Sequence, residues 1–109
     1  MLEFSFTVNE SFLNAKYSHP ITVPSSQVDY SELCKQGLDE GELTITFPRG
    51  ERTCGRMHSS KAGYGQYYQI RVNKESVPEY LREGEEVQVS LFSDSSSKYA
   101  TIEYTNSEI

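Results

Sequence analysis

The sequence predicts a mainly β protein: a small closed or partly open pseudobarrel of about seven strands with two short helices and two pseudo-symmetric halves. Three observations lead to this prediction. Apolar and polar residues alternate in several short segments, helix boundary signals are few, and one strand-and-turn unit occurs twice. A chain of 109 residues is long enough for one hydrophobic core, so we expect a single domain over residues 1–109.

Alternation with a period of two predicts half-buried strands that offer one face to a core. The pattern is clearest in segments 2–8, 43–47, 64–72, 86–92 and 99–104. In segment 64–72, one face is apolar and the other carries Tyr67, Gln69 and Arg71. Further strands are expected at 21–24 and around 52–58, where Arg52, Cys54, Arg56 and His58 share one phase.

Two segments carry helix boundary signals. Residues 29–37 begin with an acidic residue, Asp29, and end in Gly37, which suits the position after a helix C-terminus. Residues 76–84 begin with Ser76 as a candidate N-cap, have a proline near the first turn and end in Gly84. Each predicted helix has about two turns, and we expect both to plug the ends of a barrel.

The two predicted helices occupy equivalent places in an internal repeat. In each copy, a strand that begins with Ile leads to a short helix, then to the turn L-x-E-G-E, and then to a second strand. The turn lies at residues 38–42 in the first copy and at 81–85 in the second. Two such units facing each other across a pseudo-twofold axis can close a small barrel, which removes exposed sheet edges.

Charge is distributed unevenly along the chain. Ten Lys and Arg oppose sixteen Asp and Glu, which gives a net charge of −6. Residues 49–74, however, hold six basic residues and one acid, a net +5, so the remainder carries −11. A local field can attract a ligand of opposite sign whatever the total charge, so this segment indicates a site for an anionic partner. The alternative is that its basic side chains only protect outward-facing strands from aggregation.

The composition indicates a cytoplasmic protein without a membrane partner. The first residues lack the basic start of a signal peptide, and no apolar run approaches the roughly 20 residues of a membrane helix. Cys34 and Cys54 form no C-x-x-C pair, so we expect both thiols to be reduced.

No pattern in the sequence predicts an enzyme. It contains no glycine-rich phosphate loop, no H-E-x-x-H and no pair of zinc ligands, and nothing places a cysteine or histidine beside an activated nucleophile. We interpret the acidic turns at 38–42 and 81–85 as exposed turns rather than metal sites, and His19 as a surface residue. We expect no catalytic residue, no metal and no cofactor.

Four stretches occur in the order "FSFTVNESFLNAKYSHPITVP", "LTITFPRGERTCGRMHSSKAGYGQYYQIRV", "YLREGEEVQVSLF" and "KYATIEY". This order and spacing resemble the DNA-binding pseudobarrel family, which includes plant B-three transcription-factor domains and the effector domains of several bacterial restriction endonucleases. The chain departs from the plant pattern because it contains no Trp. The repeat unit alone is also similar, more weakly, to AbrB-type and double-psi barrels.

The resemblance implies a domain that recognises double-stranded DNA without catalysis, in transcription regulation or in restriction-modification. Two strand-loop-strand arms, residues 7–17 and 52–68 by position, would place side chains in the major groove. We expect residues 56–66, which lie between the two repeats, to touch the ligand. The implied DNA-binding residues are Asn9, Asn14, Lys16, Arg52, Arg56, His58, Lys61, Tyr64, Gln66, Tyr67 and Arg71.

The acidic remainder of the chain leaves an alternative from another class. A surface with a net charge of −11 outside residues 49–74 would suit a protein-interaction module. Such a module would act as an adaptor or inhibitor of a DNA-binding enzyme, in the second case by imitating nucleic acid. A small-ligand barrel is a third, weaker alternative.

Overall fold

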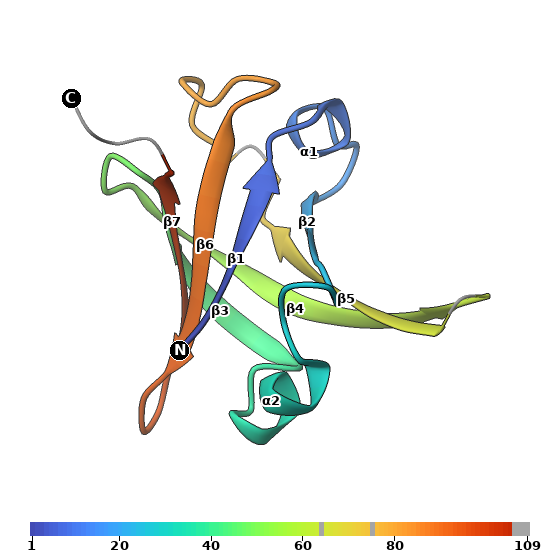
Figure 1. Cartoon of the computed structure of the whole chain (residues 1–109). Helices are drawn as coiled ribbons and strands as arrows, with labels where there is room; N and C mark the ends of the chain where they lie inside the picture. Colours follow the sequence, from blue (N-terminus) through green and yellow to red (C-terminus); the bar gives the residue numbers. More distant parts are fainter. Residues whose placement is uncertain (64, 75, 106–109) are drawn as a thin grey trace.

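The computed structural model describes residues 1–63, 65–74 and 76–105 (Figure 1). The elements are β1 (Leu2–Thr7), α1 (Glu10–Leu13), β2 (His19–Val23), α2 (Tyr30–Lys35), β3 (Gly41–Thr46), β4 (Arg52–Ala62), β5 (Gly65–Val72), β6 (Glu86–Ser93) and β7 (Lys98–Tyr104). The mainly β class with two short helices is confirmed. In the described part of the chain, neither helix has the length and apolar character needed to cross a membrane.

The seven strands form one sheet in the order β1-β6-β7-β3-β4-β5-β2. Neighbouring strands are antiparallel, except that β3 and β7 run parallel. The sheet curls until its two edge strands, β1 and β2, face each other across a narrow seam (Figure 1). At this seam the backbone N–H of Ser5 donates to Oε1 of Gln27 at 2.8 Å. The fold is therefore a nearly closed barrel, as the alternating segments predict.

The internal repeat is visible in the strand order. Counted outward from β7 in both directions around the barrel, the strands fall into three pairs: β3 with β6, β4 with β1, and β5 with β2. The isoleucines that begin the two copies, Ile21 and Ile70, lie directly opposite each other in the β2–β5 ladder. Gly41 and Gly84 have φ angles of 96° and 92°, so both turns need a residue that tolerates positive φ. The two halves are thus equivalent at the positions that define the repeat.

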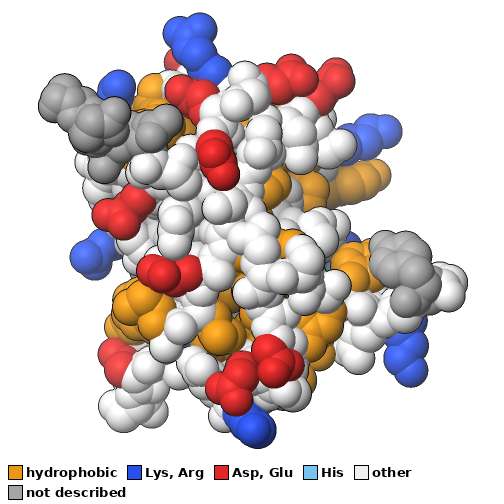
Figure 2. All heavy atoms as spheres, viewed as in Figure 1, with side chains coloured by type: hydrophobic (Ala, Val, Ile, Leu, Met, Phe, Trp, Pro, Cys, Tyr) orange, Lys and Arg blue, Asp and Glu red, His pale blue; other side chains and the backbone are white. Residues whose placement is uncertain are grey.

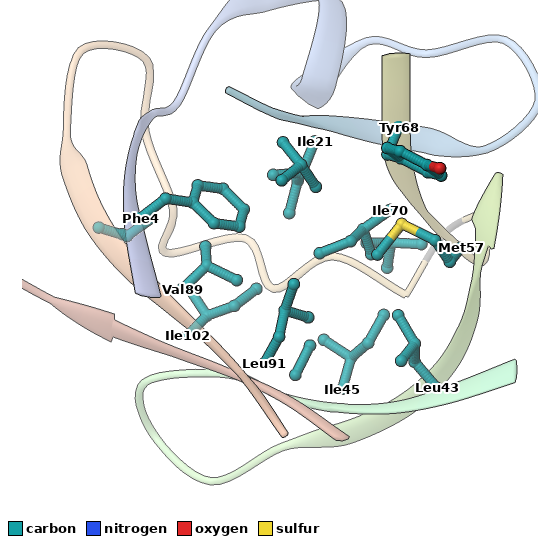
Figure 3. Packing of buried hydrophobic residues seen from close by; sticks show 14 of the residues in the cluster. Phe4, Ile21, Leu43, Ile45, Met57, Tyr68, Ile70, Val89, Leu91 and Ile102 are labelled. Carbon is teal, nitrogen blue, oxygen red and sulfur yellow. The ribbon is translucent and has the colours of Figure 1, made fainter. Parts of the chain in front are cut away.

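The core is filled by side chains from all seven strands. Figure 3 shows Phe4, Ile21, Leu43, Ile70 and Leu91 pointing into a common interior. The helices close the two ends, because Phe12 of α1 is 1% exposed and Leu33 of α2 is fully buried. Burial of these alternating apolar residues is the main stabilising contribution to the barrel.

Of the two predicted helices, the first is confirmed and the second is wrong. Helix α2 lies within the predicted range 29–37, and Oδ1 of Asp29 accepts from the N–H of Ser31 at 2.9 Å. Residues 76–84 instead form turns. Leu81 donates to the carbonyl of Pro78 at 3.3 Å, while Gly84 donates to Val8, beyond the end of β1, at 2.8 Å. The N–H groups of Leu81 and Gly84 therefore bond within a tight turn and to the residue after β1, instead of to the carbonyl groups of a helix.

Helix α1 lies inside the segment that was expected to be an arm. The side chain of Asn9 caps it by accepting from the N–H of Phe12 at 2.8 Å. His19 was expected at the surface, but it is only 7% exposed, and its Nδ1–H donates to the carbonyl of Phe12 at 2.6 Å. The apolar Phe12 ring and this hydrogen bond draw α1 and His19 together over the end of the barrel.

Candidate nucleic-acid interface

The β4–β5 hairpin projects from the barrel (Figure 1). Its inner face carries Met57, Tyr68 and Ile70, which are buried in the core. Because side chains alternate along a strand, the intervening residues point to the outer face. The opposed pairs on this outer face are Arg56 with Arg71, His58 with Gln69, and Ser60 with Tyr67. Each of these side chains is exposed or half-buried.

Strand β2 continues this outer face on the other side of β5. Pro20 pairs in register with Arg71, and Thr22 pairs with Gln69. Two hollows of about 540 and 260 Å³ adjoin here, and both are bordered by Pro20 and Gln69. We call them together the β2–β5 groove, although the larger hollow also extends to residues 5–7 of β1. The lining of the groove includes Asn9, Lys16, Tyr17, Thr22, Gln69 and Arg71.

Two projections stand beside the β2–β5 groove. One is the β4–β5 hairpin, and the other is the loop of residues 14–18 that joins α1 to β2 (Figure 1). In Figure 2 the surface is recessed between these projections, on the right-hand side of the view. Lys16 and Tyr17 are exposed on the second projection, Tyr17 to 79%. The chain thus brings residues about 50 positions apart to one groove, with an aromatic ring and cations at its border.

The basic side chains in and beside the groove form no close ion pair with the described residues. Among the described residues, the ion pair found within 4.0 Å is Lys35 with Glu32 on α2, at 3.5 Å. Arg56 lies opposite Arg71 on one side and opposite Glu42 of β3 on the other, and Lys16 lines the same hollow as Arg71. These three cations, from β4, β5 and the α1–β2 loop, form a row that can accept an anionic ligand.

The structure brings together some of the residues that the sequence singled out. Arg56, His58, Tyr67 and Arg71 share the outer face of the hairpin, and Asn9 and Lys16 line the groove beside it. The Oδ1 atom of Asn9 is occupied by its cap to α1, which leaves its amide N–H groups for a ligand.

Other predicted residues lie elsewhere. Lys61 and Gln66 are opposed to each other in the phase of the hairpin's inner face, near its tip. Arg52 pairs with Thr46 at the opposite end of β4, and Asn14 ends α1 on an exposed turn. Tyr64 lies outside the described residues. Residues 56–66 therefore do not face the ligand as one block. Alternate residues of β4, at positions 56, 58 and 60, lie on the outer face, and those between them lie in the phase of the inner face.

Gln69 is a groove residue that the sequence-based list omitted. Its Nε2 donates to Oγ1 of Thr22 at 3.3 Å, across the β2–β5 pair. The available signal was its phase, because Gln69 alternates with the core residues Tyr68 and Ile70 just as Tyr67 and Arg71 do. Thr22 gave no comparable signal, since its position beside Gln69 depends on which strands are neighbours.

Chemistry-bearing groups outside the groove are few in the described part of the chain. There, no three His, Cys, Asp or Glu side chains gather in a way that could hold a metal ion. Cys34 and Cys54 are free and exposed. The Sγ of Cys34 on α2 lies 3.5 Å from the hydroxyl of Tyr68, and this hydrogen bond together with burial raises the pKa of Tyr68 to about 12. Tyr68 is therefore a neutral core residue at physiological pH.

Comparisons of the chain with protein-family models, with curated proteins and with solved structures give no match. The fold defines the protein as a small, nearly closed β-barrel with a groove of mixed polar and apolar lining beside a projecting hairpin. The function proposed below therefore depends on the geometry and the charge of this groove.

Proposed function

We propose that the protein is a non-catalytic domain that recognises double-stranded DNA in the β2–β5 groove. The observation that carries the proposal is the row of Lys16, Arg56 and Arg71, three cations without an ion-pair partner among the described residues. The row lies on a protein whose net charge is −6. Its local charge is thus opposite to that of the molecule, as a site for a polyanion requires.

The opposed arginines supply a physical argument. Like charges directly opposite each other in a sheet destabilise it, and Arg56 and Arg71 are paired in this way. Phosphates or base edges that accept from the two guanidinium groups reduce this repulsion and gain charge-assisted hydrogen bonds. Glu42, the register partner of Arg56 on β3, offsets only part of the repulsion in the unbound protein, so a complex with an anion still relieves it.

The shape of the interface agrees with a duplex. The major groove of B-DNA is about 12 Å wide and admits a two-stranded β-ribbon. The β4–β5 hairpin is such a ribbon, and the α1–β2 loop stands on the other side of the β2–β5 groove as a second arm (Figure 1). This pair of arms also supports the resemblance to the DNA-binding pseudobarrel family, whose members act in transcription regulation and restriction-modification.

Binding of fluorescein-labelled duplexes of mixed sequence, followed by fluorescence anisotropy at increasing salt, tests the proposal. We expect a logarithmic salt slope of about −0.9 for each phosphate contacted, and hence a steep loss of affinity between about 50 and 200 mM salt. A single strand of the same sequence is the matched ligand control. An unchanged anisotropy at low salt and high protein concentration would rule the proposal out.

A protein-interaction module is the second candidate, favoured by the charge of −11 outside residues 49–74. Figure 2 shows acidic side chains spread over the visible face rather than gathered into one patch. A docking site for a basic partner needs a continuous acidic surface. Lys16, Arg56 and Arg71, by contrast, gather in and beside one groove, so we place DNA recognition first.

A further inference from the structure

We propose that Gln69 reads an adenine and Arg71 reads a guanine two base pairs away, with Thr22 as the residue that positions the Gln69 amide. This inference rests on the proposed function and deepens it. It adds a sequence preference to the general attraction of DNA, and it assigns different tasks to Arg71 and Lys16 in the groove and to Arg56 beside it.

Gln69 occupies the centre of the β2–β5 groove. It borders both hollows, whereas Asn9 borders only the larger one and Lys16 only the smaller one. Its register partners are Thr22 on one side and His58 on the other, so it lies at the middle of three adjacent strands. A half-buried amide in this place contacts whatever occupies the groove.

The hydrogen bond to Thr22 orients the amide. One N–H of Nε2 is directed to Oγ1 of Thr22 at 3.3 Å. A glutamine amide has two N–H donors and one carbonyl acceptor, so the carbonyl and the second N–H remain for a ligand. This donor and acceptor pair matches N7 and N6–H₂ of adenine in the major groove, the usual bidentate partner of Gln. A fixed amide also loses less conformational entropy on binding than a free one.

Arg71 follows Gln69 on the same face of β5, two residues further along. Alternate residues on a strand are about 6.6–6.8 Å apart. Successive bases of B-DNA rise by about 3.4 Å, so this spacing corresponds to two base steps. Arg most often reads N7 and O6 of guanine. We therefore assign the half-buried Arg71 to a guanine, and the exposed Arg56 and Lys16 to phosphates.

Selection from a duplex library with a randomised segment tests the assignment. We expect the wild-type protein to enrich an adenine and a guanine separated by one base pair. Gln69→Glu should change the adenine to cytosine, because a carboxylate accepts from cytosine N4 but cannot donate to adenine N7. It should leave the guanine unchanged. The expected discrimination between the two bases is roughly 5- to 150-fold.

Three further measurements sharpen the test. Replacing the selected adenine with 7-deazaadenine should weaken wild-type binding by a similar factor, because N7 is removed. Thr22→Val should broaden the preference at the adenine position without changing the salt slope. Gln36→Glu, which makes the same charge change beside α2 and outside the groove lining, is the matched control and should keep the wild-type preference. Circular dichroism checks that each variant is folded.

The outcomes separate this inference from the function on which it rests. Salt-dependent binding of every duplex with equal affinity, unchanged by Gln69→Glu, overturns the sequence preference and leaves DNA recognition in place. If the wild-type protein enriches a sequence and neither Gln69→Glu nor Thr22→Val alters it, the assignment to Gln69 and Thr22 is likewise overturned while DNA recognition remains. The absence of binding to any duplex at low salt overturns the proposed function, and this inference with it.

Discussion

Arg56 on β4 lies directly opposite Arg71 on β5, on the outer face of the projecting hairpin. Neither guanidinium group has a carboxylate within 4.0 Å in the described part of the chain. These two cations repel each other, although partial exposure lets water screen them and Glu42, the register partner of Arg56 on β3, offsets part of the repulsion. The hairpin keeps a locally unfavourable pair at the place where a polyanion would meet the protein.

Arg56→Gln should therefore weaken binding while leaving stability nearly unchanged. Removing the charge relieves the repulsion from Arg71 but also removes the attraction to Glu42, the register partner of Arg56 on β3, so we expect the free energy of unfolding to stay within about 0.5 kcal/mol of the wild type. The same change removes one phosphate contact, so the magnitude of the logarithmic salt slope should fall by about 1. Urea unfolding measures the first quantity, and anisotropy titrations at several salt concentrations measure the second.

Lys35→Gln is the control for this comparison. Lys35 is an exposed cation on α2 whose contact with Glu32, at 3.5 Å, is a surface ion pair of little energetic value. We expect neither the stability nor the salt slope to change measurably. A loss of DNA affinity as large as that of Arg56→Gln would show that the total charge, rather than the groove, governs binding.

His19 gives a second prediction, about the arm formed by α1 and the following loop. His19→Phe keeps an aromatic ring against Phe12 but removes the donor to the Phe12 carbonyl. Leaving a buried carbonyl without its partner should lower the free energy of unfolding by about 1–3 kcal/mol. His19→Asn places an N–H near the former Nδ1 and should recover part of this loss. Thermal unfolding of the three proteins ranks them, and equal stability of the two variants would contradict the hydrogen-bond argument.

Much of the fold was predictable because a half-buried strand is marked by the alternation of apolar and polar residues within its own segment. Alternation located the strands, and the repeated L-x-E-G-E turn located the glycines with positive φ, Gly41 and Gly84. The helix at 76–84 was wrong for a nonlocal reason, since Gly84 donates to Val8, far away in the sequence. Helix α1 was missed although Asn9 before Phe12 is a usable capping signal.

From the sequence, only the part of the candidate site on the outer face of the β4–β5 hairpin could be predicted. Strand phase placed Arg56, Tyr67 and Arg71 on the same side, but it could not show that β2 packs beside β5. The approach of Lys16 to Arg71 and the bond from Gln69 to Thr22 depend on this pairing. Such contacts follow from tertiary topology, which a two-residue period does not encode.

The repeated turn glycines give a third prediction. At Gly84 an added Cβ would meet nothing within 4 Å, so Gly84→Ala should cost only the backbone strain of positive φ, about 1–3 kcal/mol. At Gly41 a Cβ would come within 3.0 Å of Nζ of Lys98, which donates to the carbonyl of Glu40. Gly41→Ala should therefore cost more than Gly84→Ala, as urea unfolding would show.

Gly63→Ala is the control for both substitutions. Gly63 has open space around it and does not have a positive φ angle. We expect its replacement to leave the unfolding free energy within about 0.5 kcal/mol of the wild type. A loss as large as that of Gly84→Ala would mean that backbone strain at positive φ does not explain the effect.

Tyr80 gives a fourth prediction, which concerns pH. Its hydroxyl donates to Oε1 of Glu51 at 2.7 Å and accepts from the N–H of Arg49 at 3.0 Å. Burial, followed by the hydrogen bond to Glu51, raises the pKa of Tyr80 to about 12 from its ordinary value of 10.0. In the unfolded chain this phenol ionises near its ordinary pKa, whereas in the folded protein it stays neutral over the next two pH units.

The unfolded state therefore binds fewer protons than the native state between pH 10 and 12, and the free energy of unfolding falls as pH rises through this window. The stabilisation by neutral Tyr80 is complete below pH 10 and is lost as pH approaches 12. Tyr80→Phe cannot ionise, and at neutral pH it should cost about 1 kcal/mol for its lost hydrogen bonds. Urea unfolding from about pH 8 to 11.5 should show this difference shrinking, because only the wild type loses the Tyr80 contribution. A difference that stays constant with pH would mean that the phenol titrates alike in both states.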